Sequence, residues 1–161
     1  MAKTIIGVMG PGASPAPKDL EDAFEIGKLI AQQNWVLLTG GRKAGVMDAA
    51  SKGAKEFGGL TIGILPGSNK KGISDYVDIP IVTGMGSARN NINVLSCDVI
   101  VACGSGLGTA SEIMLALKAK KPVILINQDE SLLDFLNTNS TQKFYTCSSP
   151  LKVVEKINQL L

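Results

Sequence analysis

The chain has 161 residues, which is typical of one domain, and a chain of this length buries about 70% of its unfolded surface on folding. Hydrophobic residues make up 45% of the sequence but aromatic residues only 4%, so the core must be aliphatic. A net charge of +2 with both signs scattered argues against a nucleic-acid or membrane surface held by charge alone.

The residue types present exclude further classes of catalytic and metal-binding site. Histidine is absent, which excludes Ser-His-Asp and Cys-His catalysis and removes the commonest transition-metal ligand. The three cysteines, Cys97, Cys103 and Cys147, are widely spaced, which is typical of reduced thiols in a cytoplasm. The apolar runs are too short to cross a bilayer, and no signal peptide opens the chain. We therefore expect a cytoplasmic protein without a metal site, with Cys103 as a small buried hydrophobe.

The first half of the chain alternates strand and helix patterns. Apolar, β-branched runs predict strands at 4–9, 35–39 and 60–65. Apolar residues at helical spacing predict helices at 19–33 and about 45–57. The proline- and glycine-rich residues 10–17 predict a loop that is not helical, and the polar residues 68–74 predict an exposed one.

The second half repeats the alternation around one central stretch. A shorter strand is predicted at 78–82, where Pro80 indicates irregular or edge character, and a helix follows at 88–96. Residues 99–102 predict a strand buried on both faces, and a helix begins at about residue 108. Further strands are predicted at 122–126 and 144–145, with helices at 132–136 and 150–161.

Strands that alternate with helices predict an α/β fold of βαβ units: a doubly wound, mainly parallel sheet with helices on both faces. No repeat or linker divides the chain, so residues 1–161 are interpreted as a single domain. In such folds ligands bind beyond the carboxyl ends of the strands, where the strand order reverses.

Three glycine-bearing loops follow predicted strands and should meet at that edge: 10–12, 40–41 and 104–108. The last loop leads into a helix, whose N-terminus offers unpaired amides and a positive dipole to an anion. The first loop lacks the Gly-x-Gly-x-x-Gly spacing of dinucleotide enzymes. These loops therefore predict a site for a phosphorylated small molecule, lined by Gly40, Gly41, Gly104, Ser105, Gly106 and Gly108.

Three side chains complete the candidate site. Thr109 adds a hydroxyl to the last loop. Arg89 begins a predicted helix after Gly84 and Gly86, and we favour a guanidinium that binds phosphate or carboxylate over a solvated surface arginine. Glu112 is either a functional carboxylate or a helix-first-turn acid that the dipole stabilises, and its position does not decide between them.

Residues 106–112, Gly-Leu-Gly-Thr-Ala-Ser-Glu, resemble the Pro-Gly-Gly-x-Gly-Thr-x-x-Glu motif of the Lonely guy and lysine-decarboxylase-like (SLOG) proteins. Residues 39–41 and 45–50 resemble their second glycine motif. Within this superfamily, residues 63–67 and 84–90 are similar to the molybdenum-cofactor carrier branch. The resemblance extends from the first strand to about Ile126 and implies a Rossmann-like homo-oligomer, a dimer or a tetramer.

The resemblance implies a carrier that binds and protects the molybdenum cofactor, a pterin with a terminal phosphate, as its cargo. Gly106, Gly108 and Thr109 would hold an anionic group, Arg89 would neutralise charge, Glu112 would hydrogen-bond the pterin, and Gly40 and Gly41 would line the wall. Proteins that make the cofactor and molybdoenzymes are the partners that such a carrier implies.

The hydrolase branch of the superfamily implies an alternative, a phosphoribohydrolase that cleaves nucleoside 5′-monophosphates with Arg89 and Glu112. Here Gly104-Ser105 replaces the Pro-Gly of the motif, which predicts a looser turn, and Asn90 replaces the usual lysine. A nucleotide-sensing module of the same fold is a third possibility. A retained adenine nucleotide would favour that module, whereas a bound pterin would favour the carrier.

Overall fold

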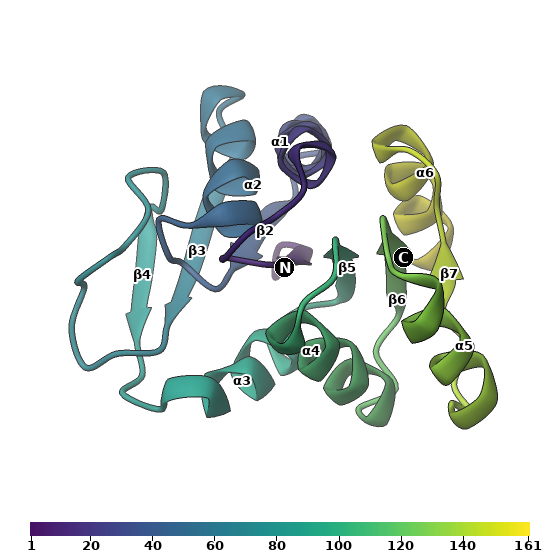
Figure 1. Cartoon of the computed structure of the whole chain (residues 1–161). Helices are drawn as coiled ribbons and strands as arrows, with labels where there is room; N and C mark the ends of the chain where they lie inside the picture. The colour runs from purple at the N-terminus through teal and green to yellow at the C-terminus, as the bar shows by residue number, and fades with distance from the viewer.

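The computed structural model describes residues 1–161, and all of its strands belong to one sheet. The strands are β1 (Ile5–Met9), β2 (Val36–Thr39), β3 (Leu60–Leu65), β4 (Ile79–Val82), β5 (Val99–Cys103), β6 (Val123–Ile126) and β7 (Tyr145–Thr146). They lie in the order β4-β3-β2-β1-β5-β6-β7, and every neighbouring pair is parallel (Figure 1). This confirms the predicted parallel α/β sheet.

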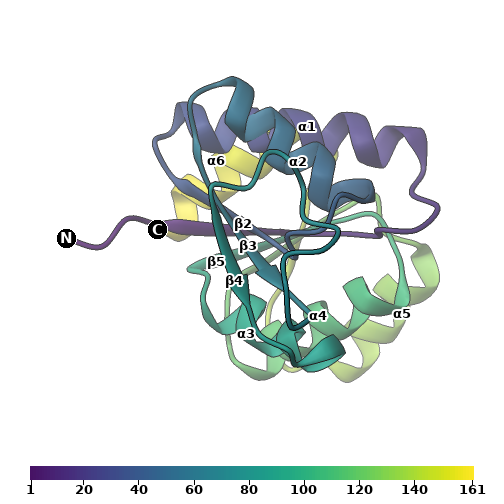
Figure 2. The ribbon, with the colours of Figure 1, turned by 90° about the vertical axis from the view of Figure 1, so that its left-hand side faces the viewer.

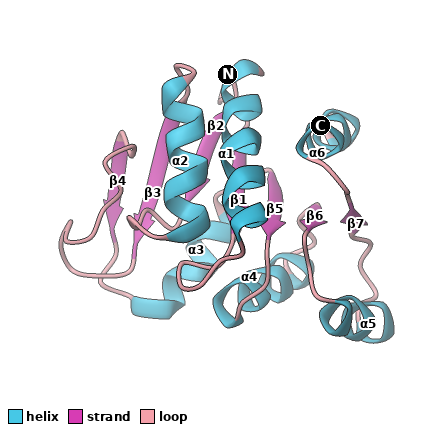
Figure 3. Ribbon diagram, turned by 45° about the horizontal axis from the view of Figure 1, so that its top comes forward, coloured by secondary structure: helices cyan, strands magenta, loops and turns pink.

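Helices cover both faces of the sheet, as Figures 1 and 2 show. One face carries α1 (Pro17–Gln32), α2 (Gly45–Glu56) and α6 (Pro150–Leu160). The other carries α3 (Arg89–Leu95), α4 (Leu107–Lys118) and α5 (Glu130–Asn139). Each face has its own aliphatic core, so the sheet separates two hydrophobic layers. Figure 3 shows the strands between the two groups of helices.

Strand β5 shows why the continuous apolar runs of this sequence form strands. Alternate side chains of a strand point to opposite faces of the sheet. Val99, Val101 and Cys103 pack with α1, α2 and α6, whereas Ile100 and Ala102 pack with α3 and α4. All five side chains are fully buried. A strand covered on both faces needs a continuous apolar run, and residues 99–103 supply it.

The strand order reverses next to β1. The chain runs from β1 outward through β2, β3 and β4, and then returns to place β5 on the other side of β1. The loops that leave β1, β2 and β5 therefore emerge side by side at the carboxyl edge of the sheet. Such a switch point is where doubly wound proteins bind their ligands.

Some predicted boundaries need correction. Helix α1 begins at Pro17, inside the stretch predicted as loop, because the first turn of a helix needs no amide from its proline. Helix α5 extends well beyond the predicted 132–136. Leu136 is its one buried residue, so its sequence lacks the strong apolar pattern from which the full length could be predicted. The last strand lies one residue later than predicted.

The expected edge character of residues 78–82 is confirmed, because β4 ends the sheet and pairs only with β3. Pro80 lies opposite Gly63 in this pairing. An edge strand tolerates proline because one side of its backbone has no partner strand. None of the helices is both long enough and apolar enough to span a lipid bilayer.

Candidate functional site

A cavity of about 500 Å³ lies at the carboxyl edge of the sheet, at the switch point. The loops after β1 and β2, the segment around Arg89 and the first turn of α4 all line it. Three of the predicted glycine loops therefore contribute to one cavity. Of the predicted site residues, those that line it are Gly40, Arg89, Gly106, Gly108, Thr109 and Glu112.

The first turn of α4 presents free polar groups to the cavity. Gly106 is the residue before the helix, and no side chain caps the amides that follow it. The hydroxyl of Thr109 is buried without a hydrogen-bond partner. A side chain added at Gly108 would meet no atom within 4 Å, so the backbone there is open to a ligand. This combination is suited to an anion.

Arg89 is the first residue of α3, and only 8% of it is exposed. A Cβ at Gly40 would lie 2.8 Å from both terminal guanidinium nitrogens, so the missing side chain makes room for the cation. Burial lowers the pKa of Arg89, and Glu112 acts in the opposite direction. The Nε atom of Arg89 is buried without an acceptor. The structure thus holds a cation in the wall of the cavity.

Glu112 lies one turn into α4 and is 6% exposed. Its Oε1 accepts a hydrogen bond of 2.9 Å from Asn93 Nδ2 and lies 3.8 Å from Nη1 of Arg89. Burial raises the pKa of Glu112 to about 7, although Asn93 and Arg89 both favour its charged form. Near neutral pH this carboxyl group therefore exists in both protonation states.

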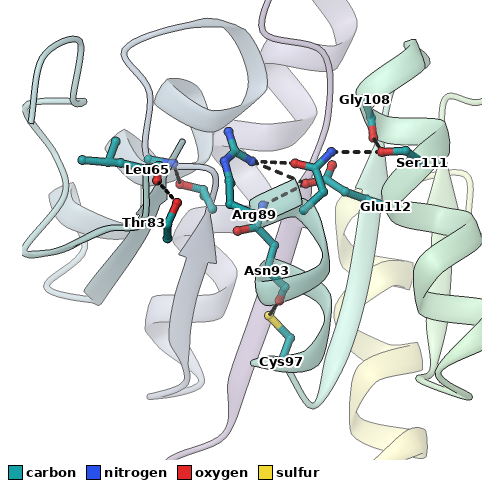
Figure 4. A network of polar contacts seen from close by, with 11 residues as sticks. Leu65, Thr83, Arg89, Asn93, Cys97, Gly108, Ser111 and Glu112 are labelled. Carbon is teal, nitrogen blue, oxygen red and sulfur yellow. Dashed lines mark hydrogen bonds and ion pairs between the residues drawn. The ribbon is translucent and has the colours of Figure 1, made fainter. Parts of the chain in front are cut away.

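A chain of hydrogen bonds joins Arg89 to the first turn of α4 (Figure 4). Arg89 Nη1 donates to Asn90 Oδ1 at 3.0 Å, and Asn90 Nδ2 donates to Ser111 Oγ at 2.9 Å. Ser111 Oγ in turn donates to the carbonyl of Gly108 at 2.7 Å. These bonds therefore fix the guanidinium group of Arg89 relative to the first turn of α4 before any ligand binds.

We predict that this buried carboxyl group makes the protein less stable as the pH rises. The pKa of Glu112 is raised from 4.5 to about 7, so the folded state binds this proton more tightly than the unfolded state. The free energy of unfolding should fall by about 2 kcal/mol between pH 5 and pH 7, and Glu112→Gln should remove this part of the dependence. Chemical denaturation across this range measures both.

Glu130→Gln is the matched control, because Glu130 also lies near the N-terminus of a helix but is exposed. This control should keep the pH profile of the wild type. An identical profile for Glu112→Gln would contradict the prediction.

Three predicted site residues do not line the cavity. Gly41 has a φ of +76° and packs against the backbone of Gly63 in β3. Gly104 has a φ of +80° and lies against the carboxylate of Asp19, so it serves the turn. Ser105 points toward the β6–α5 loop, where it donates to Gln128 Oε1 and accepts from the amide of Asp129.

The same hydrogen bonds correct the expectation of a loose turn at Gly104-Ser105. Gln128 Nε2 donates to the carbonyl of Gly104 at 2.7 Å, in addition to its contact with Ser105. The turn is tied to the neighbouring loop by side chains instead of being held by a proline. The sequence alone did not indicate this because Gln128 lies in a different loop.

Other lining residues were not among the predicted set. The loop after β1 contributes residues 10–13. Residues 10–12 were predicted to converge at this edge but were not among the predicted site residues. Arg42 and Asn90 also line the cavity, each directly next to a predicted segment. Arg42 directly follows Gly40-Gly41, and this position next to a predicted site loop is the sequence feature that could have identified it as a lining residue.

None of the three cysteines lines the cavity. Cys103 is fully buried, and its thiol donates to the carbonyl of Asp19 at 3.4 Å, which confirms its interpretation as a small buried residue. Burial raises the pKa of Cys103 to about 12. No group of three or more cysteine or acidic side chains is placed to hold a metal ion.

Comparisons with known proteins agree with the resemblance drawn from the sequence. A family model described as the SLOG cluster4 family matches residues 3–154. The molybdenum cofactor binding protein from Rippkaea orientalis is 56% identical, with 99% of this chain and 98% of that chain covered and a TM-score of 0.97. The molybdenum cofactor carrier protein from Chlamydomonas reinhardtii is 52% identical, with the same coverage and a TM-score of 0.93.

A more distant relative points to different chemistry. A cytokinin riboside 5′-monophosphate phosphoribohydrolase from Mycobacterium tuberculosis is 30% identical over 124 residues, which are 71% of this chain and 66% of that protein. The chain is therefore similar to binding proteins over its full length and to a hydrolase over part of it.

Proposed function

The chain belongs to the SLOG cluster4 family, and from this premise we propose that it is a carrier that binds and protects the molybdenum cofactor. The observation that supports the proposal most is full-length similarity, at more than half of all positions, to a protein described as a molybdenum cofactor carrier. The cofactor is the cargo of this protein. Its phosphate and its polar pterin match an anion-binding turn beside a buried carboxyl group.

Each lining residue has a part in the proposed complex. The amides of the first turn of α4 and the hydroxyl of Thr109 bind the phosphate, and Gly106 and Gly108 allow it to approach the backbone. Arg89 offsets negative charge of the cargo. Glu112 faces the pterin, whose ring nitrogens include both donors and acceptors, and a carboxyl group with a pKa of about 7 can serve either kind.

The size and polarity of the cavity support a small, charged ligand. A volume of about 500 Å³ lies within the range of about 300–1,000 Å³ that small-molecule sites occupy. Gly40 and the other glycines keep side chains out of the space, while Arg89 and Arg42 line it with positive charge. An apolar ligand would leave Arg42 without an ion-pair partner.

The test of the proposed function is protection of the cargo. The purified protein is incubated with active molybdenum cofactor, and the remaining cofactor activity is followed over time against buffer and against an unrelated protein of similar size. We expect decay to slow in proportion to the protein added. Decay at the rate of the buffer control at every concentration would contradict the proposal.

The alternative function is hydrolysis of nucleoside monophosphates, which the resemblance of Arg89 and Glu112 to the hydrolase motif favours. We expect this activity to be slow or absent. Cleavage of an N-glycosidic bond needs a carboxylate that stabilises positive charge on the ribose or activates water. Here Asn93 and Arg89 engage one oxygen of Glu112, and no histidine is available to share the proton transfer.

The assay is release of ribose 5-phosphate from several nucleoside 5′-monophosphates, with Glu112→Gln as the control. The expected result is the same low rate for the wild type and the variant. Rapid turnover by the wild type that disappears in Glu112→Gln would identify the protein as a hydrolase.

We also propose that the protein is a homodimer or homotetramer. Helices α3 and α4 lie together on one face of the sheet, and Leu95 and Met114 on them are 53% and 37% exposed. Large exposed apolar side chains on adjacent helices favour association of copies. We expect light scattering at micromolar concentration to report a multiple of 16.8 kDa. A mass of one chain would contradict this.

A further inference from the structure

Arg42 is a cation of the cavity that the proposed phosphate site does not use. It follows β2 directly and lines the cavity together with Arg89. Its side chain forms no ion pair with any acidic residue of the chain. Its charge also lowers the pKa of Arg89, so the two guanidinium groups repel each other in the free protein. A bound anion would relieve this repulsion.

The backbone holds Arg42 at this position. Arg42 forms an isolated antiparallel bridge with Ile73, and the amide of Lys43 donates to the carbonyl of Gly72. The amide of Ser74 donates to the carbonyl of Gly41. The loop that carries Arg42 is therefore fixed to the segment between β3 and β4. An arginine on such a loop lines the cavity in the absence of ligand.

The topology separates Arg42 from the anion-binding turn of α4. Arg42 follows β2 and α4 follows β5, and β1 lies between these two strands in the sheet. Neighbouring strands are about 4.8 Å apart, so the two strand ends are roughly 10 Å apart. A phosphate bound at α4 and the loop that carries Arg42 therefore lie at different strand ends.

We infer that Arg42 is a specificity-determining residue that recognises a second anionic group of the ligand, where the loop after β2 lines the cavity. The inference rests on the proposed function, in which the first anionic group is the phosphate of the cargo. The second is then the metal-bearing dithiolene group of the cofactor, which carries negative charge. A monophosphate with an uncharged far end leaves Arg42 without a partner.

The experiment compares ligands with one and with two anionic groups. Calorimetry measures binding of the molybdenum cofactor, of adenosine 5′-monophosphate and of adenosine 3′,5′-bisphosphate to wild type and to Arg42→Gln. We expect Arg42→Gln to lose about tenfold or more in affinity for the cofactor and for the bisphosphate. This factor corresponds to the loss of one charge-assisted contact. Its affinity for the monophosphate should change by less than about threefold. Arg42→Lys should keep most of the preference.

Lys43→Gln is the matched control, because it removes the same charge at the next position. Lys43 is exposed, pairs with Asp75 and does not line the cavity, so all affinities should stay at the wild-type level. Arg42 is exposed as well, so Arg42→Gln is expected to fold, and circular dichroism checks this.

The outcomes separate this inference from the proposed function. If wild type binds the cofactor and Arg42→Gln binds it equally well, the inference is overturned and the carrier function stands. An equal loss for all three ligands also overturns it, because Arg42 would then bind the phosphate. If wild type does not bind the cofactor but prefers the bisphosphate through Arg42, the carrier function fails and the second anionic subsite stands. Binding of none of the ligands overturns both.

Discussion

Gly108→Val should reduce the affinity for a phosphorylated ligand by about a hundredfold or more while leaving the fold intact. A Cβ at Gly108 meets no protein atom within 4 Å, so the fold has room for the side chain. The same space belongs to the cavity, where a branched side chain would keep the phosphate from the amides of α4. Loss of two charge-assisted hydrogen bonds accounts for this factor.

Calorimetry with the molybdenum cofactor, alongside thermal unfolding, measures both parts of the prediction. Gly67→Val is the control, since a Cβ at Gly67 has no neighbour closer than 3.9 Å and Gly67 does not line the cavity. It should bind like the wild type. If Gly108→Val binds the cofactor normally, the anion does not lie on the first turn of α4.

Arg89→Ala should have the second largest effect and reduce affinity by about tenfold to a hundredfold, because a buried charge-assisted contact is lost. The cation also lies 3.8 Å from Glu112, so its removal should raise the pKa of that carboxyl group further. Thr109→Ala provides the comparison. It removes a neutral hydroxyl and should cost only about 0.5–1.5 kcal/mol of binding free energy.

The ranking of the variants by affinity tests the proposed site as much as the magnitude of each loss does. Calorimetry should rank the affinities as wild type, then Thr109→Ala, then Arg89→Ala, with Gly108→Val weakest. Thermal unfolding of each variant separates loss of binding from loss of folding, since Arg89 is buried. Affinities equal to wild type for all three variants would place the site elsewhere in the molecule.

Local patterns predicted the fold class and the edge of the sheet at which the cavity lies. The apolar run at 99–102 could form a strand only if both of its faces were covered, and this requirement already implied helices on both sides of the sheet. The order of elements then placed the loops at 10–12, 40–41 and 104–108 at one edge. Because all three follow parallel strands, their convergence needed no knowledge of side-chain contacts.

The roles of single residues depended on contacts across the sheet. Gly104 and Ser105 were predicted to line the anion site, but Asp19 in α1 and Gln128 in the loop after β6 engage them. Gly40 appeared to be a ligand contact, yet its missing side chain also makes room for Arg89. These distinctions require the distance between residues far apart in the chain, which no local pattern contains.

Glu112 shows most clearly which properties follow from the sequence and which follow only from the tertiary structure. The sequence determined that a carboxyl group lies one turn into the helix after a glycine-rich loop, and it left open whether that group is a helix-stabilising acid or a functional one. Burial to 6% exposure, the hydrogen bond from Asn93 and the nearby Arg89 exist only in the folded chain. Desolvation by that tertiary packing raises the pKa of Glu112 toward neutrality, and an exposed first-turn acid would not experience it.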